Sequence, residues 1–397
     1  MLLAFVLIIL VLLHVQFYVK NIFLGTDEVN FFGFQIRYLF DKDIAIASLG
    51  FSVACIIAFA SCYLLAQRLA RSGPAQPPPA GSAHYALPLW PLIAAGMLQV
   101  VAAFTIVIQA GFVYQLIAEQ LEQSGFVLEL RVIFLLLLSH LLLNVRLREL
   151  MTSPKFKPAR VVTYLYIVAS LLLQARSRVF EVAAVLAFTQ LMWRGDRFRF
   201  RNLIFVGLAL IAPNIIVLGR LGWPDDFSTL IDGIFSFEYS VLFNNLLSAA
   251  IEAGPNVNQP FTFTASLSLL LPSPIRSLLG ITVVKSGYYE ELAQAADIRN
   301  GGFSLLAELF TNFGWHALWV MAAMGAIIGY LNARALRVGR ANMLISMAPL
   351  FYTAFILAFR NDLGVFLKYI VQLFVIALIM SSFIRLASMQ RPLDRRP

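Results

Sequence analysis

The stretch of sequence that decides the fold is VVTYLYIVASLLLQARSRVFEVAAVLAFTQLMW, residues 161–193. Two apolar runs flank the segment Arg176-Ser177-Arg178, and neither run is long enough to cross a bilayer comfortably. An arginine near the centre of a membrane costs about 2.5–3.5 kcal/mol even on the lenient insertion scales. Two arginines in one turn at this depth indicate a polyanionic ligand, a water-filled cavity, or both.

The composition of the chain is that of a multi-pass membrane protein. Of its 397 residues, 60% are hydrophobic and only 13% are charged, and the apolar stretches carry almost no charge. Residues 1–13 have no preceding basic region and no cleavage site of small residues, so we expect a retained first helix. We expect about ten spans, at roughly 2–19, 44–66, 88–110, 130–147, 160–175, 179–193, 202–219, 314–333, 343–359 and 364–384.

The distribution of charge orients these spans. With ten spans both termini lie on one side, and the loops and tail on that side carry 18 of the 30 lysines and arginines but only three of the 21 acidic residues. The positive-inside rule makes this side cytoplasmic. One continuous helix over 160–193 would be about 51 Å long and would put two basic loops on opposite sides of the membrane. We therefore predict a helical hairpin whose turn, at Arg176–Arg178, lies sunken below the outer surface.

We expect an all-α multi-pass fold with three consecutive parts. An N-terminal transmembrane bundle covers residues 1–219 and includes a Pro-rich cytoplasmic linker at 72–91. A large outer segment, 220–313, lies between the seventh and eighth spans as a helical or re-entrant lid over an outward cavity, and it contains an amphipathic stretch that ends at Gly254-Pro255. Residues 314–397 form the C-terminal transmembrane helices and a basic cytoplasmic tail.

Cationic residues recur at the expected outer ends of the spans. The planar guanidinium group suits bidentate binding of a diphosphate, and positive charge stabilises a diphosphate leaving group as its bond breaks. These cations are Arg176, Arg178, Arg220, Arg276, Lys285, Arg299 and Arg360. Arg176 has no acidic partner within reach along the sequence and is the strongest candidate among them.

Structural roles remain open for several of these cations. Arg220 and Arg360 end helices at an interface, where snorkelling is ordinary. Arg178 is also placed to pair with Glu181 one turn later. Arg360 is followed by Asp362, and a local ion pair would close that turn.

A second set of polar residues precedes the span at 314–333. On a helix, Glu308, Asn312 and His316 recur at intervals of four residues and share one face. If that face points into a wet cavity, Glu308 is placed to orient or deprotonate an acceptor hydroxyl. The structural alternative is that Ser304 caps the helix and Glu308 stands near its positive N-terminal dipole.

Other chemistries lack their motifs in this sequence. It has no Gly-rich phosphate loop, no His/Cys metal cluster and no serine nucleophile elbow, and its four histidines are scattered. We therefore expect no metal, no cofactor and no nucleic-acid partner.

Three short motifs carry a resemblance to a known family. They are the Arg-x-Arg turn at 176–178 between two short spans, the Leu-Pro-Ser-Pro stretch at 271–274, and the run Gly302-x-Ser304…Glu308…Asn312-Phe313-Gly314 that leads into a span. Through these motifs, and through its topology with a large late outer loop, the chain resembles the Wzy-type O-antigen and oligosaccharide-repeat-unit polymerases.

This resemblance implies a C-type glycosyltransferase fold at the periplasmic face of the bacterial inner membrane. The activity it implies is metal-independent transfer of a growing glycan from a polyprenyl diphosphate carrier to the next lipid-linked repeat unit, with membrane lipid and a chain-length regulator as further partners. The residues implied for the diphosphate are Arg176, Arg178, Arg360, Arg276, Arg299 and Arg220. Those implied for the acceptor side are Glu308, Asn312 and His316.

Two other functions remain open. An O-antigen ligase uses a similar donor but delivers the glycan to a lipid A core, and a variant of this reading would use Asp27-Glu28 as its acidic site. A flippase for lipid-linked sugars would also need a cationic cavity. The sequence, however, shows no internal repeat of the kind that marks transporters.

Overall fold

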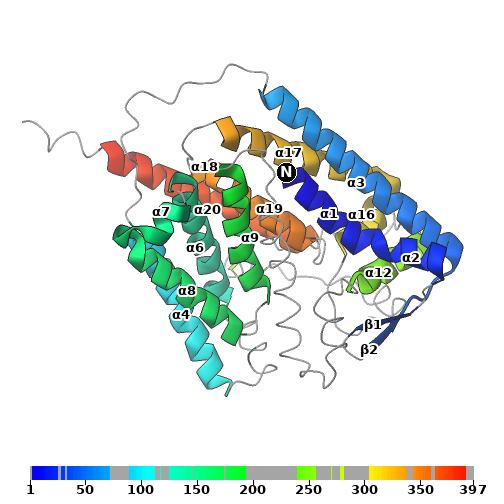
Figure 1. The fold of residues 1–397 in the computed structure, drawn as a ribbon, viewed down its shortest axis with the longest axis horizontal. Helices are drawn as coiled ribbons and strands as arrows, with labels where there is room; N and C mark the ends of the chain where they lie inside the picture. The colour runs from blue at the N-terminus through cyan, green and yellow to red at the C-terminus, as the bar shows by residue number, and fades with distance from the viewer. Residues whose placement is uncertain are drawn as a thin grey trace, which may run out of the picture. The chain divides into compact units, whose positions relative to one another are not determined.

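The structure is a computed structural model, and it describes residues 2–25, 28–31, 34–71, 89–111, 117, 125–145, 147–173, 176–193, 239–255, 270, 278–280, 304–337, 343–358 and 363–389. Figure 1 shows the helices and strands in chain order by colour. The chain divides into two compact units. Unit 1 comprises Met1–Ala70, Val217–Tyr330 and Ala354–Ile370, and unit 2 comprises Arg71–Ile216, Leu331–Thr353 and Val371–Pro397. Each unit combines three separate segments of the chain, whereas the parts expected from the sequence, 1–219, 220–313 and 314–397, are each consecutive.

The helices identify a membrane-embedded protein. Within the described residues, four segments are long and apolar enough to cross a membrane, Val6–Leu24, Lys42–Ala70, Trp90–Gln109 and Leu305–Arg334. Shorter apolar helices cover Leu130–Asn144 and Phe366–Ser382. Large apolar side chains stay exposed on the long helices, among them Ile57 and Ile108, as a lipid environment allows.

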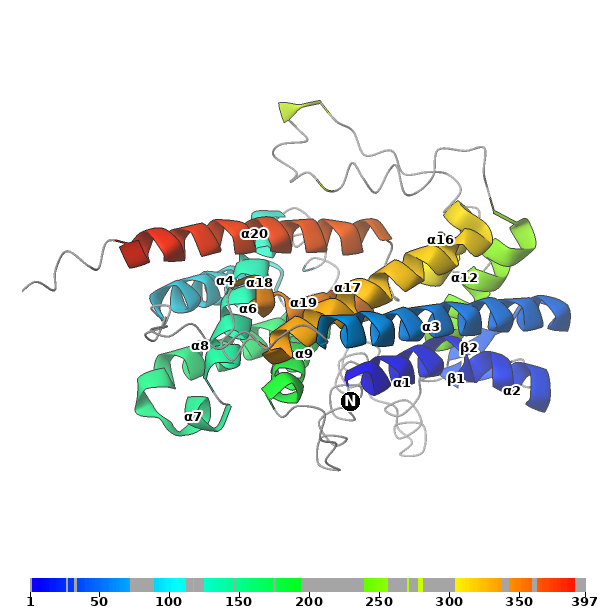
Figure 2. The same cartoon turned by 90° about the horizontal axis from the view of Figure 1, so that it is seen from above.

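Unit 1 contains two long helices, α3 (Lys42–Arg71) and the greater part of α17 (Ala317–Arg337). The other helices that lie wholly in this unit are α1 (Leu2–His14), α2 (Gln16–Leu24), α12 (Tyr239–Ala253) and α16 (Leu305–Phe313). Helix α12 packs against α16, as Figure 2 shows, and it also contacts α1 and α2. The amphipathic stretch expected to end at Gly254-Pro255 is thus a helix, and Gly254 ends it with a φ of 74°.

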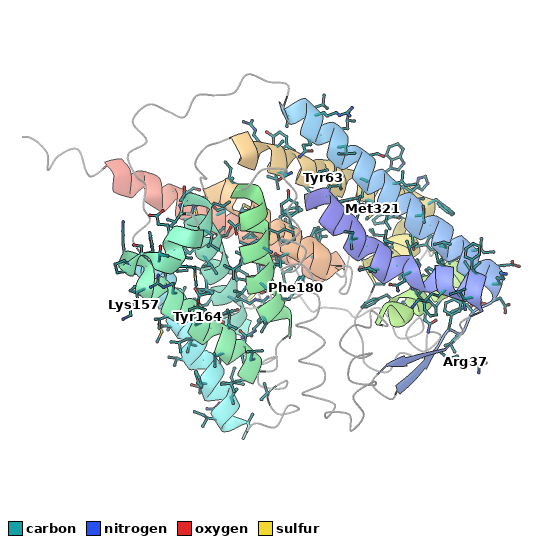
Figure 3. The ribbon with its side chains drawn as sticks, viewed as in Figure 1. Arg37, Tyr63, Lys157, Tyr164, Phe180 and Met321 are labelled. Atoms are coloured by element: carbon teal, nitrogen blue, oxygen red, sulfur yellow. The ribbon has the colours of Figure 1, made fainter. Side chains whose placement is uncertain are left out.

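Two glycines bring α17 against the backbone of α3. A Cβ atom at Gly325 would lie less than 3.0 Å from the carbonyl oxygen of Phe59, and one at Gly329 would lie equally close to that of Tyr63. This spacing of small residues lets two helix backbones approach closely. Figure 3 labels Tyr63 and Met321, which are both buried.

A two-stranded antiparallel hairpin follows α2 and was not expected, whereas the other elements of the described residues are helices, as the all-α fold class predicts. The strands of the hairpin are β1 (Glu28–Phe31) and β2 (Phe34–Arg37), and their register sets Glu28 opposite Arg37. Helix α12 holds β2, because Asn245 Nδ2 donates a hydrogen bond to the carbonyl oxygen of Arg37 at 3.0 Å.

Buried hydroxyl groups join α2, α3 and α12 behind this hairpin. Tyr18 donates to the carbonyl oxygen of Asn244 at 2.8 Å and lies 3.2 Å from Ser248 Oγ. Ser248 Oγ also lies 2.8 Å from the Tyr38 hydroxyl and 3.0 Å from Ser48 Oγ. Ser248 is therefore the centre of a polar network inside an apolar unit.

Replacing Ser248 by alanine should destabilise unit 1. The variant leaves buried hydroxyls on Tyr38 and Ser48 without this partner, and an unsatisfied buried polar group costs about 1–3 kcal/mol. The thermal midpoint of the purified protein in detergent should fall, whereas Ser382→Ala, which removes an exposed bond to Leu378, should leave it unchanged. Equal midpoints for both variants would contradict the network's role.

Tyr38 should make the protein sensitive to alkali. Burial raises the pKa of its phenol from 10.0 to about 12, nearby Glu252 adds to the rise, and the hydrogen bond to Ser248 opposes it. The folded state therefore binds the Tyr38 proton more tightly than the unfolded state does. The contribution of the protonated phenol to stability is complete below pH 10 and is lost as the pH rises toward about 12.

The measurement is the thermal midpoint between pH 9 and pH 12. Tyr38→Phe should flatten its decline, and Tyr164→Phe, at an exposed tyrosine, should not. A decline of the same steepness in wild type and Tyr38→Phe would show that Tyr38 does not contribute to it.

Unit 2 is a bundle of α4 (Trp90–Gln109), α6 (Gly125–Asn144), α8 (Lys157–Leu172) and α9 (Arg176–Trp193). Figure 1 shows these four helices beside one another. The short helix α7 (Leu147–Thr152) and a 3-10 turn at Pro154–Phe156 lead into α8. Arg160 fixes this connection by donating to the carbonyl oxygens of Leu150, Met151 and Ser153 at 2.7, 2.7 and 3.0 Å.

Helix α18 (Met343–Ser346) lies in unit 2. Helices α19 (Ala348–Ala358) and α20 (Leu363–Met389) each contain residues of both units. Every expected span except 202–219, which lies outside the described residues, coincides with helical residues. Two boundaries were wrong in detail: Val15 divides the first span into α1 and α2, and the apolar segment expected from residue 314 begins already at Leu305.

Candidate functional site

The predicted helical hairpin is formed by α8 and α9, which pack against each other in unit 2. Contrary to expectation, Arg176–Arg178 do not form the turn of this hairpin. Helix α8 ends at Leu172 and α9 already begins at Arg176, so the turn precedes Arg176. Arg176 and Arg178 thus occupy the first turn of a helix and not an irregular loop. At a helix start the free backbone N–H groups add positive potential to that of the arginines.

The side chain of Arg178 is buried in a cluster of charges. Arg178 is 3% exposed and Glu181 is 1% exposed. The carboxylate of Glu181 contacts a different arginine, because Arg131 Nη1 of α6 lies 3.4 Å from Glu181 Oε1. Arg178 lies near enough for its charge to interact with both of them. The expected local pair of Arg178 with Glu181 is therefore part of a three-residue cluster.

Polar and aromatic residues of α8 complete this cluster. The Tyr166 hydroxyl interacts with the charges of Glu181, Arg131 and Arg178, and it lies near Ser170. The Tyr166 ring packs at 4.7 Å, centroid to centroid, from Phe134 of α6. Tyr166 and Ser170 are each 2% exposed. We define the anion cluster as Arg131, Tyr166, Ser170, Arg178 and Glu181.

The composition of the anion cluster determines its chemistry. The cluster brings the guanidinium groups of Arg131 and Arg178 together with the carboxylate of Glu181 within an apolar bundle. Charge is costly in such surroundings unless it is paired, and guanidinium groups bind carboxylate or phosphate groups through charge-assisted hydrogen bonds. Phe180, labelled in Figure 3, lies on α9 beside these residues and is itself buried.

Three members of the cluster were not singled out from the sequence: Arg131, Tyr166 and Ser170. Arg131 is the second residue of the expected span 130–147 and follows Glu129 by two residues. A charge at the end of a span is ordinary, so the sequence carried no signal that singles it out. Tyr166 and Ser170 recur at an interval of four residues in α8, a spacing too common to identify a site.

The second expected set lies in unit 1. Glu308 and Asn312 of α16 are buried, and Asn312 Nδ2 donates to the carbonyl oxygen of Glu308 at 2.8 Å. Ser304 precedes the helix as expected, but its hydroxyl makes no capping bond and has no hydrogen-bond partner among the described residues. Ser304 therefore occupies the N-cap without a capping bond from its hydroxyl, and Glu308 lies in the first turn of α16, as the structural alternative expected.

The expected polar face of Glu308, Asn312 and His316 is interrupted. Helix α16 ends at Phe313, and Gly314 turns the chain with a φ of 53° before α17 begins at Ala317. The ring of Pro255 lies 3.3 Å from the position of a Cβ at Gly314, so both conformation and space favour glycine there. His316 is exposed, whereas Glu308 and Asn312 are buried, and the periodicity argument does not extend to it.

Helix α12 contributes further buried polar groups beside α16. Asn244 and Asn245 are 0% and 1% exposed. The side-chain amide of Asn244 has no hydrogen-bond partner among the described residues, and neither has Asn245 Oδ1. Sequence reasoning treated this helix only as an amphipathic part of the lid and missed these residues.

The remaining expected cations lie outside the described residues. They are Arg220, Arg276, Lys285, Arg299 and Arg360. Asp27 and Asp362 lie outside them as well, and of Arg176 only the helical backbone is described. Of the expected site residues, the structure therefore gives side-chain surroundings for Arg178 in unit 2 and for Glu308, Asn312 and His316 in unit 1.

One buried serine and histidine pair resembles a nucleophile with its base. Ser346 Oγ lies 2.8 Å from His140 Nδ1, and Asn144 Nδ2 lies 3.3 Å from His140 Nε2. Ser139 Oγ also donates a hydrogen bond to the carbonyl oxygen of Ser346 at 2.6 Å, and these contacts fix α18 on α6.

No group of three or more His, Cys, Asp and Glu residues is placed to hold a metal ion in the part of the chain that the structure describes. The chain matches no protein-family model, no curated protein and no solved structure.

Proposed function

We propose that the protein polymerises lipid-linked oligosaccharide repeat units of an O-antigen or a similar surface polysaccharide. It transfers the growing glycan from a polyprenyl diphosphate carrier to the next repeat unit at the periplasmic face of the bacterial inner membrane. The observation that supports this most directly is the anion cluster, in which the buried Arg178 and Glu181 lie with the partly buried Arg131 in a membrane-embedded helical bundle. The choice of this particular enzyme family rests on the resemblance of the sequence motifs at 176–178, 271–274 and 302–314.

The arginines serve the leaving group in this proposal. The bond between the anomeric carbon and the diphosphate oxygen breaks, and its electron pair leaves with the diphosphate. Positive charge held in place at that oxygen stabilises the transition state more than the ground state. Arg178 and Arg176 of α9 hold the diphosphate, with Arg360, Arg276, Arg299 and Arg220 as further ligands.

Glu308 serves the acceptor. The hydroxyl oxygen of the next repeat unit attacks the anomeric carbon and forms the new glycosidic bond. The proton of this hydroxyl passes to the Glu308 carboxylate. Asn312, which donates a hydrogen bond to the carbonyl oxygen of Glu308, is the second residue proposed for the acceptor side.

The test is direct reconstitution. The purified full-length protein in detergent is incubated with lipid-linked repeat units, and the products are separated by size. A ladder of glycans spaced by one repeat unit is expected. Absence of a ladder with the correct substrate, together with measured translocation of that lipid in vesicles, would contradict the proposal and favour a flippase.

A genetic readout separates the polymerase from a ligase. Cells that lack a polymerase still cap their lipid A core with single repeat units, and cells that lack a ligase leave the core bare. We expect the single capped unit. A bare core would show that the protein acts at the ligation step.

A further inference from the structure

We propose that the connection between α7 and α8 binds the headgroup of an anionic phospholipid of the surrounding membrane. We define the elbow surface as Met151, Lys155, Lys157, Arg160 and Tyr164, which all belong to unit 2. The positive-inside rule assigns this basic loop to the cytoplasmic side of the membrane. The inference is independent of the proposed function, because it involves neither the anion cluster nor the acceptor side.

Arg160 gives the elbow surface a fixed shape. Its Nη1 atom donates to the carbonyl oxygens of Leu150, Met151 and Ser153, so the end of α7 is tied to the first turn of α8. The Tyr164 hydroxyl points back toward α7, where it donates to Met151 Sδ at 3.9 Å. Hydrogen bonds therefore hold the exposed side chain of Met151 next to the cationic start of α8.

The charge of this connection favours an anionic partner. Lys155 and Lys157 are exposed, and neither forms an ion pair within the described residues. Residues 146–160 contain five lysines and arginines but only one acidic residue, Glu149, which is also exposed. Clustered lysines and arginines at a membrane surface attract anionic lipid headgroups.

The helix itself gives no reason for cations at this end. Helix α8 begins at Lys157, and its N-cap residue, Phe156, makes no capping bond. The free N–H groups of a helix start carry partial positive charge, which repels a lysine and attracts an anion. Lys155 lies at the same end, with its Nζ 5.6 Å from the centroid of the Phe156 ring. A phosphate headgroup is therefore attracted by the lysines and by the helix start alike.

An exposed apolar face continues along α8 from these cations. Five residues recur at intervals of three or four and are all exposed, so they form one face of the helix: Lys157, Val161, Tyr164, Val168 and Leu171. Figure 3 labels Lys157 and Tyr164 on this face. A lysine, then a tyrosine, then aliphatic residues follow the order of headgroups, interface and acyl chains in a bilayer. This order favours a lipid over a soluble phosphate compound or an acidic protein.

The test measures the affinity of the full-length protein in detergent for the first bound phosphatidylglycerol, by native mass spectrometry. Lys155→Gln combined with Lys157→Gln should lower it about tenfold or more at low salt, because two charges at the headgroup are lost. Lys20→Gln combined with Lys42→Gln removes the same charge from two exposed lysines of unit 1 and should bind like wild type. Wild-type affinity in the first double variant, or an equal loss in both, would overturn the proposal.

Thermal stability gives a second measurement on the same proteins. Phosphatidylglycerol should raise the thermal midpoint of wild type and of the Lys20/Lys42 variant, because it binds the folded state, and it should raise that of the Lys155/Lys157 variant less. Phosphatidylcholine, which has no net charge, should shift all three equally. Both pairs of lysines are exposed, so all three proteins should fold. An equal shift of all three by phosphatidylglycerol would overturn the proposal.

Inorganic phosphate separates a lipid from a soluble ligand. At constant ionic strength it should release little phosphatidylglycerol, because it lacks acyl chains to cover the exposed apolar face of α8. Release of phosphatidylglycerol by millimolar phosphate would show that the elbow surface binds a soluble phosphate compound, and this too would overturn the proposal.

Discussion

Replacing Gly325 or Gly329 by leucine is expected to abolish the recovery of folded protein. A Cβ at either position would lie less than 3.0 Å from a backbone carbonyl oxygen of α3, at Phe59 and Tyr63 respectively. Backbone atoms cannot rotate away as a flexible side chain can, so the two helices would have to separate. Overpacking costs about 1–3 kcal/mol where neighbours can adjust, and we expect at least the upper end here.

The measurement is the yield of monodisperse protein in size-exclusion chromatography and its thermal midpoint in detergent. Gly50→Leu is the matched control, since Gly50 lies on α3 and a Cβ there meets nothing within 4 Å. Normal yield and midpoint for Gly325→Leu or Gly329→Leu would show that α3 and α17 do not approach as closely as described.

Replacing Arg178 by glutamine is expected to reduce glycan polymerisation about 100-fold or more, as loss of a group that stabilises transition-state charge does. The protein should still fold, because Arg131 and Glu181 remain as a balanced pair. This separates Arg178 from a purely structural cation, whose removal would lower the thermal midpoint and the activity together. Arg176→Ala should lose the ladder in the same way.

The ladder assay is run on wild type, Arg178→Gln and Arg68→Gln, an exposed arginine on α3. The control should polymerise normally. Wild-type turnover in folded Arg178→Gln would remove this residue from the site, and with it the main structural support for a diphosphate at α9.

Much of the helical architecture could be predicted from the sequence. The apolar runs gave the helices at α3, α4, α6, α8 and α9 because a bilayer demands long hydrogen-bonded apolar segments. Charge in the loops gave the hairpin of α8 and α9. The break at Gly314 and the hairpin of β1 and β2 were not predicted, because a positive φ and a strand register depend on neighbours such as Pro255 and Asn245.

The candidate site divides in the same way. The sequence by itself determined that Arg176 and Arg178 lie among apolar helices and that an arginine there needs a partner, because charge in an apolar medium is costly wherever it stands. Only the tertiary structure decided which charged residues lie together with Arg178, namely Arg131 and Glu181. Arg131 lies 47 residues before Arg178 in the chain, and it is the packing of α6 against α9 that brings Arg131 to Glu181 beside Arg178.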